Sequence, residues 1–405
     1  MPLCPSRTGH APVTTATEDS KLSKVLRSDI TLGEPLPYSI FDERGLLLLR
    51  AGIAITLPSQ IDRLVARNAV WATARDLALA DAAAAPVEAP PRNSQPVFDQ
   101  VDSLISNLKH ALTTAIKSPE QIDLPARITK IATAIQLLCG EDLDGALAAP
   151  QLDAHNPYIV VHQVMGAILT EVMGWYADLS PEQRLPLMCA ALTRDLGQLT
   201  LQSEIDKVEG PLPEMLKAAM REHPRRSQEI LAHAGVNETA WLEAVLQHHE
   251  RLDGSGYPLQ LRAEAVGLGG RILAIADSYS AMTKPRPYRN KEMYAQNALR
   301  DIYLQKDTQL DGGLTQSLIK EIGMLPPGSI VRLKCGEIAA VKHRAMRTDG
   351  IAVYSVYNQK GMPLMQPVRR ETSTPGFEIA GMVPFSECRS AAVTIKRLWL
   401  NEFKI

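Results

Sequence analysis

Helix-period segments fill the middle of this chain, from residue 99 to residue 325, and they constrain the fold more than any other feature. Apolar residues recur there at spacings of three and four, and Gly, Pro, Asp or Asn separates each segment from the next. Only 5% of all residues are aromatic, so Leu, Ile, Val, Ala and Met must build the core, which suits helices better than β-sandwiches. We therefore predict a mainly α-helical protein around a central helical bundle.

Smaller modules are expected on both sides of this bundle. Residues 21–75 hold two short apolar runs around a turn at Asp42–Gly45 and then a helix-like segment, which predicts a small α+β or β module. Residues 76–98 are rich in Ala and Pro and have no periodicity, as is typical of a linker. Residues 326–405 alternate β-branched runs with turns, which predicts a small, barrel-like β domain.

Charge and cysteine usage exclude several classes of protein. The chain carries 43 Lys and Arg against 45 Asp and Glu, a net charge of -2, which argues against binding DNA or RNA through bulk charge. Its five cysteines are odd in number and widely spaced, so they signal neither a disulfide framework nor a zinc ribbon. No apolar stretch approaches the roughly 20 residues of a membrane span. We expect a cytoplasmic protein with no membrane association.

Histidine is crowded into one part of the chain, with six of the nine between residues 155 and 249. A single helical histidine is more often a hydrogen-bonded residue than a ligand, and we keep that interpretation for His155 and His233. The others form an ordered series with two aspartates: His162, Asp195, His223, His248, His249 and Asp277. Helices that each bring such a group into one bundle would bury it unpaired unless a metal binds. Imidazole and carboxylate ligands together suit iron, manganese, nickel or zinc.

The segment from His248 to Pro258 is the most specific motif in the chain. It reads His-His-Glu-Arg-Leu-Asp-Gly-Ser-Gly-Tyr-Pro, and its glycines permit a tight turn whose backbone can approach a phosphate. As a whole it resembles the signature of the HD-GYP family, bacterial metal-dependent phosphohydrolases that open cyclic di-GMP. The resemblance covers about residues 150–325 and implies an HD-type helical domain.

The resemblance also implies roles for individual residues. The metal ligands would be His162, Asp195, His223, His248, His249 and Asp277, with Asp195 bridging two ions. The turn Gly256–Tyr257–Pro258 and the basic pair Arg286 and Arg289 would contact the dinucleotide. In this family a hydroxide held between two metals, iron or manganese foremost, attacks phosphorus and yields linear pGpG or GMP.

The chain departs from the family in the catalytic phrase around Asp195. Arg194 stands where the family has a ligand histidine, and Gln198 stands where it has a lysine. A guanidinium has no free lone pair, so Arg194 cannot coordinate a metal. Further along, Ser280 replaces a second acid, and Tyr158 stands where some members place a glutamate.

These departures affect the two metal positions unequally. The first position keeps His162, Asp195 and Asp277 but loses its fourth ligand, whereas the second keeps a complete set, Asp195 with His223, His248 and His249. Two alternatives stay open for Arg194. Its charge lies against the nearby carboxylates in place of the missing cation, or its side chain turns to solvent.

We therefore predict a cyclic di-GMP signalling protein whose phosphodiesterase-type domain, with one or two divalent metals, has impaired or lost hydrolysis through Arg194. The alternative is an active metal-dependent phosphodiesterase, and a third candidate acts on a related nucleotide. A partner signalling protein and a homodimer are both compatible with the sequence. The flanking modules are expected to serve sensing, partner binding or packing.

Overall fold

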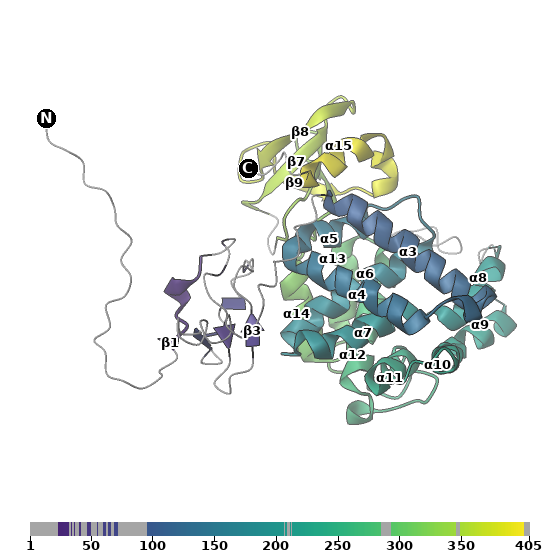
Figure 1. Ribbon diagram of the computed structural model, residues 1–405. Coiled ribbons are helices and arrows are strands. Elements are labelled where there is room, and N and C mark those ends of the chain that lie inside the picture. Colours follow the sequence, from purple (N-terminus) through teal and green to yellow (C-terminus); the bar gives the residue numbers. More distant parts are fainter. Residues whose placement is uncertain are drawn as a thin grey trace, which may run out of the picture. The chain divides into compact units, whose positions relative to one another are not determined.

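The computed structural model divides the chain into two compact units, Met1–Arg92 and Asn93–Ile405 (Figure 1). It describes residues 95–400 apart from 206, 209–210, 212, 285–292 and 346–348. In the first unit it describes residues 23–31, 34, 36, 40–41, 47–49, 55, 60–61, 64–65 and 69–71. The turn predicted at Asp42–Gly45 and most of the predicted linker lie outside the described residues.

The first unit contains a small antiparallel sheet. Its strands are β1 (Ser23–Lys24), β2 (Ile40–Phe41), β3 (Leu47–Leu49) and β4 (Val70–Trp71), in the order β1-β4-β2-β3. A short 3-10 helix, Arg27–Asp29, follows β1. The buried side chains of Ile40 and Ile55 contribute to its core.

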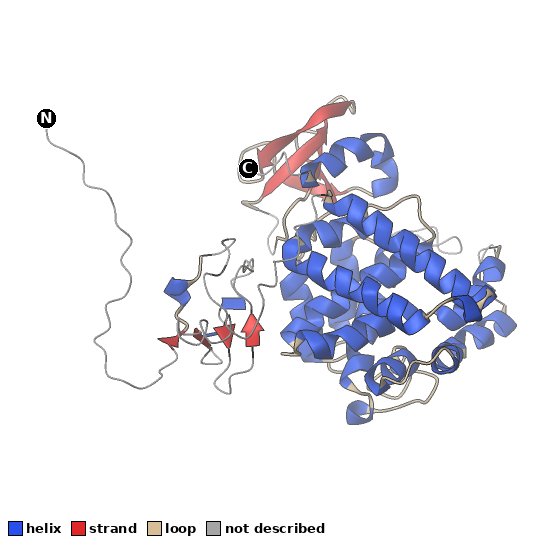
Figure 2. Cartoon of the chain, in the orientation of Figure 1, coloured by secondary structure: helices blue, strands red, loops and turns tan. Residues whose placement is uncertain are grey.

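The second unit is dominated by helices, as predicted (Figure 2). In chain order they are α3 (Val97–Lys117), α4 (Leu124–Glu141), α5 (Leu143–Gln151), α6 (Tyr158–Tyr176), α7 (Pro181–Thr193), α8 (Leu199–Ile205), α9 (Glu214–Arg221), α10 (His223–His233), α11 (Thr239–Gln247), α12 (Leu268–Thr283), α13 (Ala295–Leu304) and α14 (Gly312–Ile322). None of the described helices is long and apolar enough to cross a membrane.

Helix α6 lies at the centre of the bundle. Every residue from Ile159 to Gly174 is buried, because α6 packs against α5, α7, α12 and α14. A helix that is apolar on all sides is stable only when other helices surround it. Helix α7 begins with a capping box, in which the Ser180 hydroxyl accepts from the backbone N–H of Gln183 and the Gln183 side chain accepts from that of Ser180.

A five-stranded antiparallel sheet follows the helices. Its strands are β5 (Ile330–Leu333), β6 (Ile338–Ala340), β7 (Ala352–Tyr357), β8 (Pro363–Glu371) and β9 (Ile379–Met382), in the order β8-β7-β6-β5-β9. Because β8 and β9 form its two edges, this is an open sheet rather than a closed barrel. The short helix α15 (Ala392–Lys396) packs against β8.

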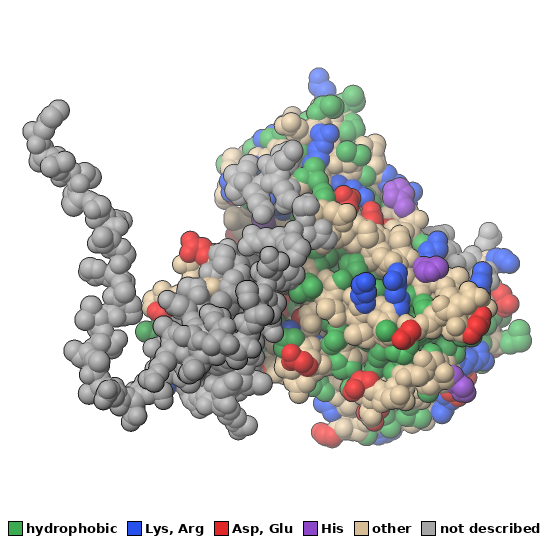
Figure 3. Space-filling view, viewed as in Figure 1, with side chains coloured by type: hydrophobic (Ala, Val, Ile, Leu, Met, Phe, Trp, Pro, Cys, Tyr) green, Lys and Arg blue, Asp and Glu red, His purple; other side chains and the backbone are tan. Residues whose placement is uncertain are grey.

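Some residues of the sheet, among them Ile330 and Ile338, belong to the hydrophobic core of the helices. Others, among them Val331, form a second, smaller core. The rings of Phe98 on α3 and Trp399 near the C-terminus lie 5.2 Å apart. Asp144 on α5 pairs with His343 at 2.9 Å and with Arg344. In the space-filling view, side chains of both charges are mixed over the visible face of this unit, in keeping with the small net charge (Figure 3).

Candidate metal centre

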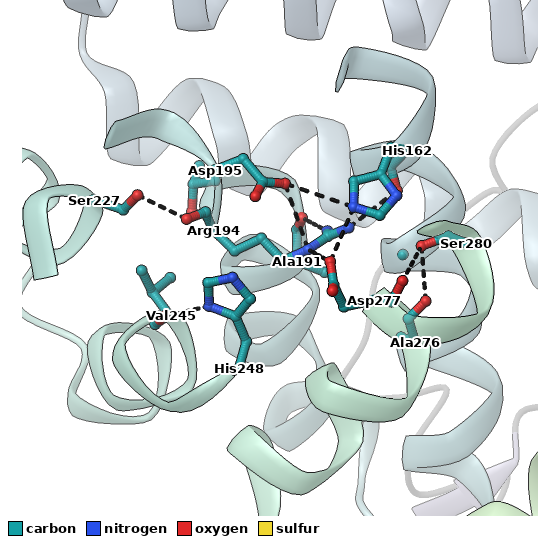
Figure 4. A network of polar contacts seen from close by, with 12 residues as sticks. His162, Ala191, Arg194, Asp195, Ser227, Val245, His248, Ala276, Asp277 and Ser280 are labelled. Atoms are coloured by element: carbon teal, nitrogen blue, oxygen red, sulfur yellow. Dashed lines mark hydrogen bonds and ion pairs between the residues drawn. The ribbon is translucent and has the colours of Figure 1, made fainter. Parts of the chain in front are cut away.

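Five neighbouring elements bring the six candidate metal ligands together. Figure 4 shows His162, Asp195, His248 and Asp277 among them. One group consists of His162 on α6, Asp195 directly after α7, and Asp277 on α12. The other consists of His223, the first residue of α10, and His248 and His249, which follow α11. Within each group the candidate ligand atoms lie within 4.8 Å of one another. His155 and His233, which the sequence set aside, are exposed.

The imidazoles of His223 and His248 face each other through their Nε2 atoms, which are 3.1 Å apart. Their Nδ1 atoms lie 2.6 Å from the backbone carbonyls of Met220 and Val245. Since a carbonyl can only accept, each Nδ1 carries the proton, and in the neutral ring each Nε2 has a lone pair. Burial lowers the pKa of His248 well below its usual range. Two lone pairs at this spacing repel each other unless a metal ion or an extra proton lies between them.

Asp195 and His249 complete a four-donor set around this pair. Oδ1 of Asp195 lies 3.4 Å from Nε2 of His223, and the ring centre of His249 lies 4.1 Å from that of His248. Burial lowers the pKa of His249 to about 3, so this ring is also neutral and able to donate a lone pair. Three imidazoles and a carboxylate, with two of the rings held by backbone carbonyls, fit a divalent transition metal.

A guanidinium occupies the other half of the centre. Arg194 is 1% exposed, which excludes the alternative that its side chain turns to solvent. Its Nε lies 3.1 Å from Oδ1 of Asp277 and 3.6 Å from Oδ2 of Asp195. Its terminal nitrogens donate to the backbone carbonyls of Ala191 and His162 (Figure 4).

His162 and Asp277 are paired with each other beside this guanidinium. Nε2 of His162 lies 2.9 Å from the same Oδ1 of Asp277 that accepts from Arg194. Although burial raises it, the hydrogen bond from His162 and the positive charge of Arg194 hold the pKa of Asp277 well below its usual range. Burial, followed by the charge of Arg194, lowers the pKa of His162. This half therefore presents two carboxylates that already have a cation.

The loop that contains the signature motif, residues 248–258, is held in place by Glu250, which is 1% exposed. Its carboxylate accepts from the backbone N–H of Leu259 at 2.6 Å and of Leu261 at 2.9 Å. Gly256 is required by close packing, since a Cβ there would lie 2.4 Å from the backbone N of Arg251. The ring centre of Tyr257 lies 4.7 Å from that of His249. Gly256, Tyr257 and Pro258 thus line a turn beside a candidate ligand.

Sequence comparison shows which known proteins the helical region is similar to. Residues 146–314 match the HD domain family. Over 281 residues the chain is 25% identical to a cyclic di-GMP phosphodiesterase of Pseudomonas aeruginosa, covering 66% of this chain and 67% of that protein. Residues 146–314 are thus similar to HD domains, and the chain is similar to cyclic di-GMP phosphodiesterases. Its relatives also include the cyclic di-GMP phosphodiesterase response regulator RpfG of Xanthomonas campestris pv. campestris, at 34% identity over 38% of this chain and 41% of that protein.

The relatives differ in the substrate that their names state. The 3'3'-cGAMP-specific phosphodiesterase 3 of Vibrio cholerae is 31% identical over 43% of this chain and 38% of that protein. The chain thus spans less than half the length of the Vibrio and Xanthomonas proteins.

The other departures from the HD-GYP pattern also have a visible place in the structure. The ring of Tyr158 stacks on that of His162, with ring centres 5.2 Å apart and planes 17° from parallel. The hydroxyl of Ser280 donates to its own helix, at 2.7 Å from the carbonyl of Ala276, rather than toward the centre (Figure 4). Gln198 is buried in a 3-10 turn directly after Asp195. Arg286 and Arg289 lie outside the described residues.

Sequence reasoning missed residues that hold the centre in place. Ser227 on α10 donates to the carbonyl of Arg194 at 2.7 Å and accepts from the backbone N–H of Gly197 at 2.8 Å. It thereby fixes the turn that carries Asp195. Its position one turn after His223 was the only sequence signal. Glu250 belongs to the signature, but its partners lie nine and eleven residues later, where no periodic pattern points to them.

Proposed function

We propose that the HD-GYP domain of this chain binds cyclic di-GMP as part of a signalling protein, and that its hydrolysis of the dinucleotide is impaired or lost. The buried guanidinium of Arg194, in contact with both carboxylates of the first metal position, is the observation that carries this proposal. The relatives named as cyclic di-GMP phosphodiesterases support the choice of ligand.

One divalent metal ion would be held by Asp195, His223, His248 and His249. Iron and manganese are our first choices, because HD-GYP relatives imply them, and nickel or zinc would suit the same donors. When bound, the ion supplies positive charge to a phosphate oxygen of the ligand. The carbonyls of Met220 and Val245 fix the direction of two of the rings, so that their Nε2 atoms face the ion.

The remaining contacts to the dinucleotide would come from the signature turn and from two basic residues. Glu250 holds the turn, so Gly256, Tyr257 and Pro258 can present backbone groups to the ligand without rearrangement. By resemblance, Arg286 and Arg289 would pair with its phosphates, since a guanidinium matches two phosphate oxygens at once. None of these contacts depends on the first metal position.

Hydrolysis depends on the first position more strongly than binding does. Two metals clamp the attacking and leaving oxygens of an in-line displacement, and Arg194 supplies charge but no exchangeable coordination site. Each ~1.4 kcal/mol of lost transition-state stabilisation slows the reaction tenfold, so a loss of several powers of ten is expected. The complete four-donor group favours the alternative of slow residual hydrolysis over a total loss.

The test combines calorimetric binding with product analysis on the full chain loaded with Mn²⁺ or Fe²⁺. We expect saturable binding of cyclic di-GMP with at most trace formation of pGpG or GMP. Asp195→Ala serves as the control, because it removes a ligand of the second position. Rapid turnover that Asp195→Ala abolishes would show that the domain is an active phosphodiesterase. A parallel titration with 3'3'-cGAMP tests the substrate class stated for the Vibrio relatives.

A further inference from the structure

The space that Arg194 occupies is provided by a glycine on another helix. Gly166 lies on α6, one turn after His162, and a Cβ built on it would lie 2.6 Å from Nη1 and 3.1 Å from Cζ and Nη2 of Arg194. Real Cβ atoms do not approach other atoms so closely, so no larger residue fits while the guanidinium stays in place. Glycine is an unfavourable residue inside a helix, which means that this position needs a specific reason for it.

Arg194 is held from every side of its guanidinium. Nε contacts the carboxylates of Asp277 and Asp195, Nη1 donates to the carbonyl of Ala191, and Nη2 donates to that of His162 at 3.3 Å. A long cationic side chain with an oxygen partner at each nitrogen cannot move aside without leaving several buried groups unpaired. The cation is therefore fixed rather than exchangeable.

The guanidinium of Arg194 lies at the first metal position of the HD-GYP pattern. Three metal-ligand candidates remain there: His162, Asp195 and Asp277. Arg194 contacts both aspartates directly, and His162 shares its partner Asp277. Two buried carboxylates are costly without positive charge nearby, and here one such charge is already built into the chain. A divalent ion added at this position would meet the guanidinium at contact distance. The residues present do not fit a metal there.

We propose that Arg194 and Gly166 form a pair in which the guanidinium permanently fills the first metal position and the glycine provides the space for it. The domain then binds one metal ion per chain, at the four-donor group, and its first position keeps its structure without metal. This inference rests on the metal centre of the proposed function, but it does not depend on the identity of the nucleotide.

A double-mutant cycle on the full-length, metal-free chain tests the pairing. Gly166→Ala is expected to lower the melting temperature, because the new Cβ displaces the guanidinium. In the background of Arg194→Gln, which removes the guanidinium, the same change should be neutral or raise it, since alanine favours a helix. A decrease of equal size in both backgrounds would overturn the pairing.

Gly174 offers a matched control on the same helix. A Cβ there would lie 2.9 Å from Cγ and Cδ of a different arginine, Arg184, which pairs with Glu171. Gly174→Ala should therefore lower the melting temperature by the same amount whether residue 194 is Arg or Gln. Rescue of Gly174→Ala by Arg194→Gln would show that the effect at Gly166 is not specific, and would also overturn the pairing.

Counting metal ions tests the second half of the proposal. After saturation with Mn²⁺ and removal of excess, the wild-type chain should retain one ion, and Arg194→His should retain two because it restores an imidazole. Two ions on the wild-type chain, or one on a folded Arg194→His chain, would overturn the exclusion of metal by Arg194. If Arg194→His does not fold, the wild-type count decides alone. Neither readout uses a nucleotide, so failure to bind cyclic di-GMP would refute the proposed function and leave the pair intact.

Discussion

At the scale of single residues, proton positions distinguish the two halves of the centre. The Nε2 atoms of His223 and His248 face each other with their lone pairs. Only a cation or an extra proton between them removes this repulsion. In the other half a cation is already present, because Oδ1 of Asp277 receives hydrogen bonds from His162 and Arg194 and Oδ2 of Asp195 lies 3.6 Å from Nε of Arg194. One half therefore calls for a metal and the other does not.

Ser227 gives a prediction that belongs to this scale. Ser227→Ala removes the hydroxyl that bridges the carbonyl of Arg194 and the N–H of Gly197, leaving two buried backbone groups without this partner. We expect a loss of about 2 kcal/mol in the free energy of unfolding and weaker metal binding, since the turn carrying Asp195 loosens. Urea denaturation and a Mn²⁺ titration measure the two effects.

The exposed Ser103 on α3 is the control for this prediction. Its hydroxyl also donates to a backbone carbonyl, that of Asp99, but water can replace it. Ser103→Ala should change the free energy of unfolding by less than about 0.5 kcal/mol. Equal effects of the two substitutions would contradict the role assigned to Ser227.

Single residues also mark where sequence reasoning reached its limit. The order of histidines and aspartates was enough to predict that six side chains would converge. The fate of Arg194 was left open between two alternatives, because it depends on Gly166, which lies on a different helix and follows no recognisable motif. The space beside a side chain is a property of packing, and sequence spacing does not report it.

At the scale of elements, the loop after α11 is held by one carboxylate. Glu250→Ala removes two charged hydrogen bonds to the backbone of Leu259 and Leu261, each typically contributing about 1.5–3 kcal/mol. We expect faster amide hydrogen exchange across residues 251–261 and weaker binding of cyclic di-GMP. Metal content should change little, because His248 and His249 precede the loop. Exchange mass spectrometry and calorimetry measure these effects.

Glu264 provides the comparison, because it is an exposed residue of the 3-10 turn Ala263–Ala265 that follows the same loop. Glu264→Ala should leave both exchange and binding unchanged. If Glu250→Ala also left the exchange of residues 251–261 unchanged, the loop would be held by other contacts.

The helices themselves were largely predictable, since three- and four-residue spacing of apolar residues is a direct consequence of helix geometry. The order of the strands in the sheet was not predictable from the sequence. The pairing of β5 with both β6 and β9 joins Val331 to Met382, far apart in sequence, through backbone hydrogen bonds that any side chain permits. Alternation of apolar residues predicts strands but does not specify their neighbours.

At the scale of the whole second unit, helices and sheet are coupled through a shared core and through Asp144. Although burial raises it, the hydrogen bond from His343 and the charge of Arg344 lower the pKa of Asp144 below the ordinary value of an aspartate. A carboxylate with a lowered pKa stabilises the fold above its ordinary pKa and loses that contribution as the pH falls through the lowered value. The contacts of Asp144 between α5 and the sheet therefore stabilise this unit less at acidic pH.

We therefore predict that part of the acid sensitivity of this unit disappears in Asp144→Asn. The substitution should lower the urea midpoint at about pH 7, and the difference from the wild type should shrink as the pH falls below the ordinary pKa of an aspartate, about 4. The unit should still unfold in one transition monitored by tryptophan fluorescence and far-ultraviolet circular dichroism, because its larger hydrophobic core extends from the helices into the sheet. A difference independent of pH would contradict the lowered pKa.

The account as a whole depends on the guanidinium of Arg194 lying at the first metal position that the resemblance to the HD-GYP family predicts. Anomalous diffraction from crystals of the full chain saturated with Mn²⁺ tests this most directly. We predict a single anomalous peak, among Asp195, His223, His248 and His249, with the Arg194 side chain between Asp195 and Asp277. A second peak among His162, Asp195 and Asp277, with Arg194 displaced, would contradict it.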